Sequence, residues 1–166
     1  MFNVGDCVVY GAHGVFIIRE ISNLKLTEKE LQYYVLNPVF DSKSTFYIPV
    51  EKVNELGNLR AVLNREEFEN IFCVAMDADL EWISDDNTRK EFCQSAIKSG
   101  NREDIIAVIK MLYLKQQELK GTGKHFHIAD EKLFKTAEKL LHEEIAYVFN
   151  ISFDEVPKFI QSKIKR

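Results

Sequence analysis

The sequence predicts an α+β protein in which a small curled β-sheet or barrel precedes an all-helical region of about five helices. Within residues 1–63, short runs of β-branched and aromatic residues alternate with glycines and polar turns, a pattern typical of strands. From Asn64 onward, apolar residues recur every three to four positions, a pattern typical of helices packed on a core. The change of period predicts two domains, residues 1–63 and residues 64–166.

The N-terminal region is expected to begin with a hairpin. Its strands are Cys7–Tyr10 and Val15–Ile21, and Gly11 and Gly14 bracket a turn that needs positive φ. Because Val15–Ile21 is apolar on both faces, it is expected to be a central strand. A turn is predicted at Glu51–Asn58, and the remaining strands are predicted at Leu31–Leu36, Thr45–Val50 and Leu59–Leu63.

The predicted strand Thr45–Val50 is expected at a sheet edge because Pro49 has no amide hydrogen to donate to a neighbour. Its inward and outward residues alternate, with Phe46, Ile48 and Val50 opposed to Thr45, Tyr47 and Pro49. An exposed edge can accept a strand from a partner protein. In an ordinary barrel, Pro49 would instead prevent such pairing. The residues alone leave both readings open.

The helices of the second region follow from apolar stripes and capping residues. Gly100 suits the left-handed position that ends a helix, and Asp154 is preferred to Ser152 as the last N-cap because proline is tolerated only in a first turn. The predicted helices are Arg65–Met76, Asp86–Ser99, one capped by Asn101 and ending near Lys120, Asp130–Asn150, and one capped by Asp154.

The composition, with 46% hydrophobic and 29% charged residues, is typical of a soluble globular protein. No apolar run approaches the roughly 18 residues of a membrane span, and the first residues lack a secretory signal, so a cytoplasmic location without membrane contact is expected. Cys7, Cys73 and Cys93 are scattered and odd in number, which argues against disulfides and a zinc site.

The net charge is −4, and the acidic excess is concentrated in one part of the chain. Residues 64–101 carry 4 basic and 9 acidic side chains, whereas residues 102–166 carry 12 and 10. A protein that binds DNA alone by neutralising phosphates is normally basic. Any nucleic-acid contact must therefore be local or made with the help of a partner.

Motifs of enzymes are missing from the sequence. His142 is followed by two glutamates but not by the second histidine of HExxH, and His125 and His127 have no third ligand at useful spacing. Phosphate-binding glycine loops and the GxSxG elbow are also absent. His13 is expected to be a turn histidine rather than a base. A non-enzyme without cofactor or metal is predicted.

A family resemblance begins at the N-terminus, in Val4-Gly5-Asp6-Cys7-Val8-Val9-Tyr10 and His13-Gly14-Val15. It continues through Tyr33-Tyr34-Val35-Leu36, Ile48-Pro49-Val50, Leu59-Arg60 and Lys98-Ser99-Gly100. The chain resembles, over nearly its whole length, the CarD-type bacterial transcription regulators, whose opening module is similar to that of the transcription-repair coupling factor.

The resemblance implies that residues 1–63 form a Tudor-like barrel that docks on the β subunit of RNA polymerase. The implied contact residues are Thr45, Phe46, Tyr47, Ile48 and Pro49. Tyr47 stands where other members often have a basic residue, so the contact is expected to depend on aromatic packing.

Trp82, the only tryptophan, has two interpretations. From its residue type alone, it is an anchor buried against the helices. The resemblance instead implies an apolar wedge in the minor groove of promoter DNA at the upstream edge of the bubble. Asp85 and Asp86 follow where basic residues would be expected, so Arg89 and Lys90 are expected to supply positive charge.

Further basic residues surround Gly121 and Gly123, namely Lys115, Lys120, Lys124, His125 and His127. Such a set is usually a solvated surface, and phosphate contact is the alternative. Lys98 is a separate candidate. The expected DNA-contacting residues are Trp82, Arg89, Lys90, Lys98 and Lys124.

Two functions remain after these observations. In the first, a monomer tethers itself to the polymerase β subunit and modulates open-complex stability through its helical domain. In the second, the protein is an adaptor that docks on polymerase or another partner and never contacts DNA.

Overall fold

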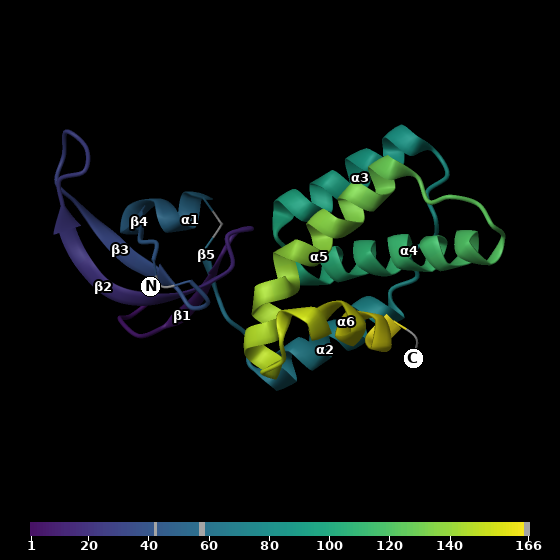
Figure 1. Ribbon diagram of the computed structural model, residues 1–166. Helices are drawn as coiled ribbons and strands as arrows, with labels where there is room; N and C mark the ends of the chain where they lie inside the picture. Colours follow the sequence, from purple (N-terminus) through teal and green to yellow (C-terminus); the bar gives the residue numbers. More distant parts are fainter. Residues whose placement is uncertain (42, 57–58, 165–166) are drawn as a thin grey trace. The chain divides into compact units, whose positions relative to one another are not determined.

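The computed structural model describes residues 1–41, 43–56 and 59–164 (Figure 1). The chain divides into two compact units, Met1–Leu63 and Asn64–Arg166. The first unit is built on an antiparallel sheet and the second is helical, so the predicted α+β class is confirmed. Among the helices of the described residues, none is long and apolar enough to cross a membrane.

The first unit contains a five-stranded sheet with the order β4-β3-β2-β1-β5, in which every neighbouring pair is antiparallel. Figure 1 shows β2 and β3 as a long, curved pair. Their register shifts between Ile18 and Glu20 of β2, as it does at a β-bulge. The predicted end at Ile21 is too early because the polar residues after it continue to pair with β3. The strands are β1 (Cys7–Tyr10), β2 (Val15–Leu24), β3 (Leu31–Pro38), β4 (Phe46–Pro49) and β5 (Leu59–Ala61).

The β1–β2 turn is formed as the glycines predict. Gly11 and Gly14 have φ values of 49° and 105°, where side chains other than hydrogen are disfavoured. The amide of Tyr10 donates to the carbonyl of Gly14 (3.0 Å), and the amide of His13 donates to that of Tyr10 (2.8 Å).

One core joins all five strands of the first unit. β4 and β5 occupy the two edges of the sheet, yet Ile48 of β4 and Leu59 of β5 belong to the same buried cluster. A sheet whose edge strands share a core must curl, as predicted for a small barrel-like module. The buried members of the cluster are Val8, Phe16, Ile18, Tyr34, Leu36, Ile48 and Leu59.

The predicted turn at Glu51–Asn58 is wrong for the residues that the structure describes. Val50–Lys52 form the 3₁₀ helix η1 and Val53–Leu56 form the short helix α1. Val50 and Val53 pack against the sheet core, which favours a helical turn over an open one. Gly57 and Asn58 lie outside the described residues.

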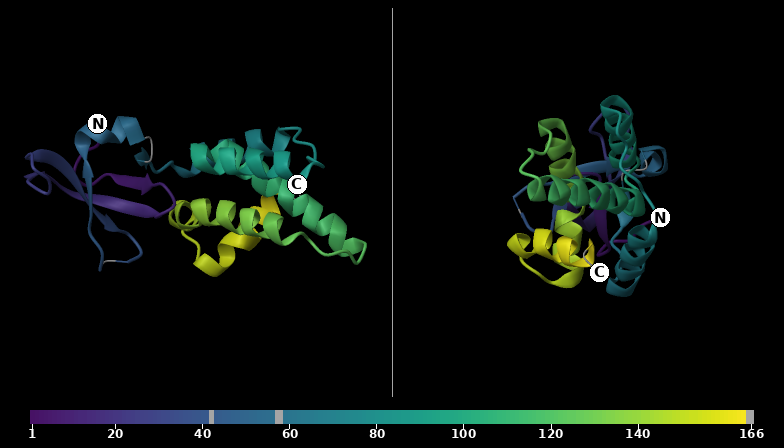
Figure 2. Two further views of the ribbon diagram at one scale, coloured as in Figure 1. Left: turned by 90° about the horizontal axis from the view of Figure 1, so that it is seen from above. Right: turned by 90° about the vertical axis from the view of Figure 1, so that its right-hand side faces the viewer.

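The second unit is organised around α4, which contacts α2, α3 and α5. This helix lies between the α3–α5 pair and the α2–α6 pair in Figure 1 and in the right-hand view of Figure 2. Seven of its residues between Ile105 and Tyr113 are buried. The helices are α2 (Arg65–Asp77), α3 (Asp86–Ser99), α4 (Arg102–Gly121), α5 (Ile128–Phe149) and α6 (Val156–Ile164), preceded by the 3₁₀ helix η2 (Phe153–Glu155).

Most helix ends follow the capping residues. The side chain of Asn101 accepts a hydrogen bond from the amide of Asp104, and Gly100 adopts the left-handed conformation. Asp154 is not the cap of the last segment, which is a correction. The amide and hydroxyl of Ser152 both donate to the Glu155 carboxylate, so Ser152 is the N-cap of η2, which begins at Phe153.

Candidate functional site

The edge strand β4 presents its residues in two directions. Tyr47 is 48% exposed, whereas Ile48 is 4% exposed and pairs with Tyr34 on β3. Thr45, just before β4, is exposed, while Phe46 and Pro49 are half-buried. Of the five predicted contact residues, Thr45 and Tyr47 are therefore the ones whose side chains are available, and Ile48 supports them from the core.

Phe46 connects β4 to the β1–β2 turn through an aromatic cluster. Its ring lies 5.0 Å from that of Phe16 in an edge-on arrangement and 5.7 Å from that of His13. The exposed His13 ring stacks on Tyr10 at 5.0 Å. His13 is thus part of the aromatic surface beside β4, a role that single-residue reasoning about a turn does not reveal.

The connection from β3 to β4 is fixed by one side chain. The Nδ2 group of Asn37 donates to the Ser44 carbonyl (3.2 Å) and to Oγ1 of Thr45 (3.3 Å). Because Asn37 also pairs with Ile17 in the sheet, the start of β4 is tied to the centre of the module.

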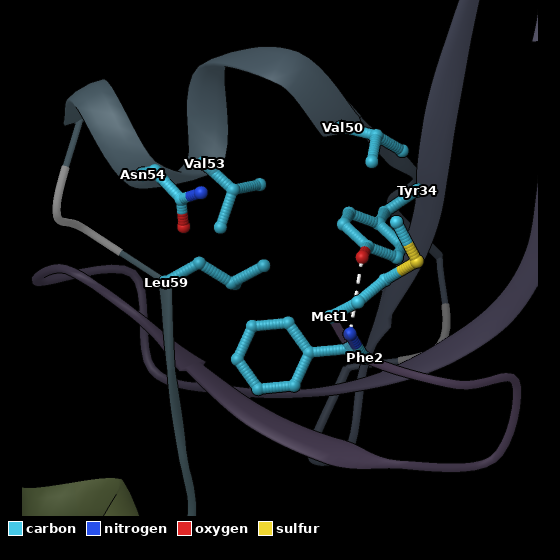
Figure 3. A pocket seen from close by; sticks show the side chains of 7 residues that line it. All are labelled: Met1, Phe2, Tyr34, Val50, Val53, Asn54 and Leu59. Carbon is cyan, nitrogen blue, oxygen red and sulfur yellow. Dashed lines mark hydrogen bonds between the residues drawn. The ribbon is translucent and has the colours of Figure 1, made fainter.

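A cavity of about 360 Å³ lies in the same unit, between the N-terminal residues and α1 (Figure 3). The amide of Phe2 donates to the Tyr34 hydroxyl (3.1 Å) at its wall. Its described lining is mostly apolar and consists of Met1, Phe2, Tyr34, Val50, Val53, Asn54 and Leu59.

Trp82 lies in the irregular segment between α2 and α3 and is half-buried. The guanidinium carbon of Arg89 lies 4.3 Å from the centre of its ring, and the Nζ atom of Lys115 lies 5.3 Å from it. A cation over an indole face contributes about 0.5–2 kcal/mol, depending on desolvation. Trp82 is therefore held against the helices while part of it remains accessible.

Arg89 is not available for DNA, which corrects the prediction made for it. Its residue is only 3% exposed, and all five of its N–H groups have acceptors within the protein. Nε and Nη2 bind the two carboxylate oxygens of Asp130 at 2.9 and 2.8 Å, and Nη1 donates to the Ile83 carbonyl at 2.8 Å. The hydrogen bonds with Asp130 outweigh burial and raise the pKa of the Arg89 guanidinium.

The two aspartates after Trp82 have structural partners. Asp85 caps α3, and the hydrogen bonds from the Thr88 hydroxyl and amide lower the pKa of its carboxyl. Asp86 binds Nη2 of Arg89 at 2.7 Å. Their charges therefore stabilise the start of α3, although the Asp86 side chain remains 72% exposed.

The other predicted DNA-contacting residues are spread over the second unit. Lys90 and Lys98 are exposed on α3, and Lys124 is exposed after α4. Lys120, His125 and His127 are also exposed, as a solvated surface would be. Lys115 differs from them because it binds Glu118 at 3.1 Å and lies over Trp82.

Sequence reasoning missed Asp130, which is 4% exposed near the start of α5 and lies 41 positions after its partner Arg89. One signal was present: Arg89 lies four and seven positions before Cys93 and Ala96, on the buried stripe of α3. Burial, together with the negative charge of Asp130, raises the pKa of the Cys93 thiol to about 11.

The first unit is thus a curled sheet with an accessible edge strand, and the second is a helical unit with a half-buried tryptophan. Residues 2–63 match the family described as CarD-like/TRCF RID domain, and residues 75–161 match that described as CarD, C-terminal domain. The chain belongs to the CarD-like family of transcription regulators.

A relative covers almost the same length. A protein of Bacillus subtilis (strain 168) named "Putative transcription factor YdeB" is 24% identical over 159 residues, which span 96% of this chain and 99% of that protein.

Proposed function

We propose that this regulator binds the β subunit of RNA polymerase through β4 and stabilises promoter open complexes through Trp82. One observation carries the proposal beyond family membership. β4 is an edge strand of the sheet, and its outward residue Tyr47 is 48% exposed. An edge strand with an exposed aromatic residue suits the addition of a partner strand, with Tyr47 packing on it.

The contact to polymerase combines backbone and side-chain terms. As an edge strand, β4 offers backbone hydrogen-bonding groups on the side away from β3, although Pro49 has no amide hydrogen to donate. Tyr47 adds apolar area and a hydroxyl group, and Thr45 extends the same exposed surface. Phe46 and Ile48 hold the strand in place from the interior.

The contact to DNA is assigned to Trp82 together with Lys90, Lys98 and Lys124, which are exposed lysines of the same unit. An apolar ring inserted at the edge of melted DNA offsets part of the cost of unstacking. A net charge of −4 is compatible with this role, because a factor tethered to polymerase needs little affinity for free DNA.

Stabilisation follows from a difference in affinity between two states. If the regulator binds the open complex about tenfold more tightly than the closed one, it shifts the equilibrium by about 1.4 kcal/mol. Whether a promoter is activated or repressed then depends on which step limits initiation there.

A second candidate is an adaptor that binds polymerase without touching DNA. The observation that favours it is electrostatic: the charge of Arg89 is used inside the protein, and the acidic Asp85 and Asp86 are exposed near Trp82. Phosphates would be repelled at this point unless the lysines compensate.

The tether is tested by capture of the isolated β subunit on immobilised regulator. Tyr47→Ala is expected to reduce capture about tenfold or more, as loss of an aromatic anchor does. Leu26→Ala is the matched control. Leu26 is an apolar residue that is 55% exposed, but it lies in the β2–β3 turn and not on β4. Equal capture by both variants would place the interface elsewhere.

The DNA contact is tested by the lifetime of promoter open complexes after addition of a competitor. Trp82→Ala is expected to abolish the extension of lifetime while capture of polymerase persists. Phe92→Ala, which removes another partly exposed aromatic residue, is the control. An unchanged lifetime with Trp82→Ala would favour the adaptor.

A further inference from the structure

The segment that carries Trp82 has no helical or strand pairing of its own, and side chains from other helices hold both of its ends. At its start, Nζ of Lys110 on α4 donates to the carbonyls of Met76 and Ala78. At its end, Nη1 of Arg89 donates to the Ile83 carbonyl, directly after Trp82. The backbone on both sides of the indole is therefore fixed by cations.

The Arg89 side chain is itself fixed by a second residue, Asp130. Asp130 binds it through two parallel hydrogen bonds, and the two side chains are 4% and 6% exposed. A bidentate pair fixes the plane of the guanidinium as well as its distance. The orientation of Arg89 is thus set by a residue at the start of α5.

The same guanidinium plane supports the indole of Trp82 at 4.3 Å. Arg89 therefore acts on Trp82 twice, through the backbone carbonyl of Ile83 and through the ring. A wedge gains from such support, because a ring that is ordered before binding loses less conformational entropy on contact.

We infer that Asp130 and Lys110 are positioning residues for Trp82: Asp130 orients Arg89 beneath the indole, and Lys110 fixes the start of its segment. This inference rests on the proposed function only where it predicts a change in open-complex lifetime. The positioning of Trp82 is a property of the free protein and can be tested without polymerase or DNA.

The experiment replaces the buried pair with apolar side chains, Arg89→Met/Asp130→Leu. Such replacements often preserve or raise stability, so the helices are expected to remain folded while the support for Trp82 is lost. Because Trp82 is the only tryptophan, its fluorescence reports on this site alone. Expected results are stronger quenching by acrylamide, lower anisotropy and a loss of open-complex lifetime of roughly tenfold.

The matched control is Arg102→Met/Glu144→Leu. Arg102 and Glu144 form a second ion pair of low exposure, between α4 and α5. Arg102 lies 13 positions before Lys115, about 20 Å along α4 from the side that faces Trp82. This control is expected to leave the quenching and anisotropy of Trp82 unchanged.

Two milder variants keep the inference testable if the double variant fails to fold. Arg89→Lys keeps the charge but loses the planar fork, and Lys110→Met removes only the anchor at Met76 and Ala78. Both are expected to increase quenching of Trp82. Unchanged quenching in folded variants would overturn the inference. If Trp82→Ala did not change the open-complex lifetime, the proposed function would be overturned. The quenching experiment on the free protein would still test the positioning roles of Asp130 and Lys110.

Discussion

The β4 edge and the Trp82 segment present aromatic side chains by different means. Tyr47 points outward because strand residues alternate, and its direction is fixed by the pairing of Val35 with Tyr47. Trp82 lies outside regular structure, and its direction is fixed by Arg89 and Lys115, which come from two different helices. The first surface depends on backbone geometry and the second on long-range side-chain contacts.

The difference determines which substitutions can reach each surface. At β4, an outward residue can be changed without disturbing the fold, since the strand is held by Ile48 and its pairing partners. At Trp82, substitution of a buried residue such as Asp130 should alter the orientation of the exposed part of the indole, although Asp130 itself contacts no binding partner.

The largest effect is expected from Asp130→Ala. It leaves the guanidinium of Arg89 buried without its main partner, which costs about 3–5 kcal/mol in the free energy of unfolding. Asp86→Ala removes the exposed partner of the same Arg89 and should cost less than about 1 kcal/mol, because solvent screens that pair. Urea denaturation compares the two variants, and equal losses would contradict the buried role of Asp130.

The next effect is expected within β4, where neighbouring residues should behave oppositely. Ile48→Ala opens a cavity in the sheet core and should destabilise the protein by about 2–5 kcal/mol. Tyr47→Ala should change stability by less than about 0.5 kcal/mol, since half of its surface is in solvent. Denaturation followed by circular dichroism measures both. A large loss for Tyr47→Ala would mean that it packs in the core and that its binding defect reflects unfolding.

The smallest effect concerns acid stability at the start of α3. The hydrogen bonds from Thr88 lower the pKa of the Asp85 carboxyl below its ordinary value of 3.8. Its contribution is therefore present above that value and is lost as the pH falls through the lower, folded value. Asp85→Asn can still cap α3 but does not titrate, so its melting temperature should fall less steeply below pH 3.8 than that of the wild type.

A charge-matched control separates this cap from general charge effects. Asp79→Asn removes one exposed carboxylate from the same segment and should keep the wild-type slope of melting temperature against pH. Identical slopes for the two variants would show that the cap does not contribute to acid stability.

Local patterns predicted the features that depend on neighbouring residues. The alternation in Thr45–Val50 and the missing amide of Pro49 indicated an edge strand, and the structure confirms that β4 lies at an edge. The cap at Asn101 and the stop at Gly100 also follow from local chemistry. These contacts span a few residues, so the sequence displays them directly.

Features that depend on distant residues were not predictable in the same way. Arg89 looked like surface charge because charged residues are usually exposed, and its partner Asp130 lies 41 positions away. The helical turn at Val50–Leu56 forms because Val50 and Val53 pack on the sheet core, which no local pattern displays. The contacts of Trp82 with Arg89, and of Arg89 with Asp130, could therefore be identified only from the three-dimensional structure.

The proposed contact between Trp82 and promoter DNA in the open complex can be detected by photocrosslinking. A photoreactive p-benzoylphenylalanine in place of Trp82 would be irradiated in complexes of polymerase with labelled promoter. We expect crosslinks to DNA at the upstream edge of the bubble, and we expect Tyr47→Ala to abolish them by weakening binding to the β subunit. Crosslinks to polymerase subunits alone would contradict the proposed contact and identify an adaptor.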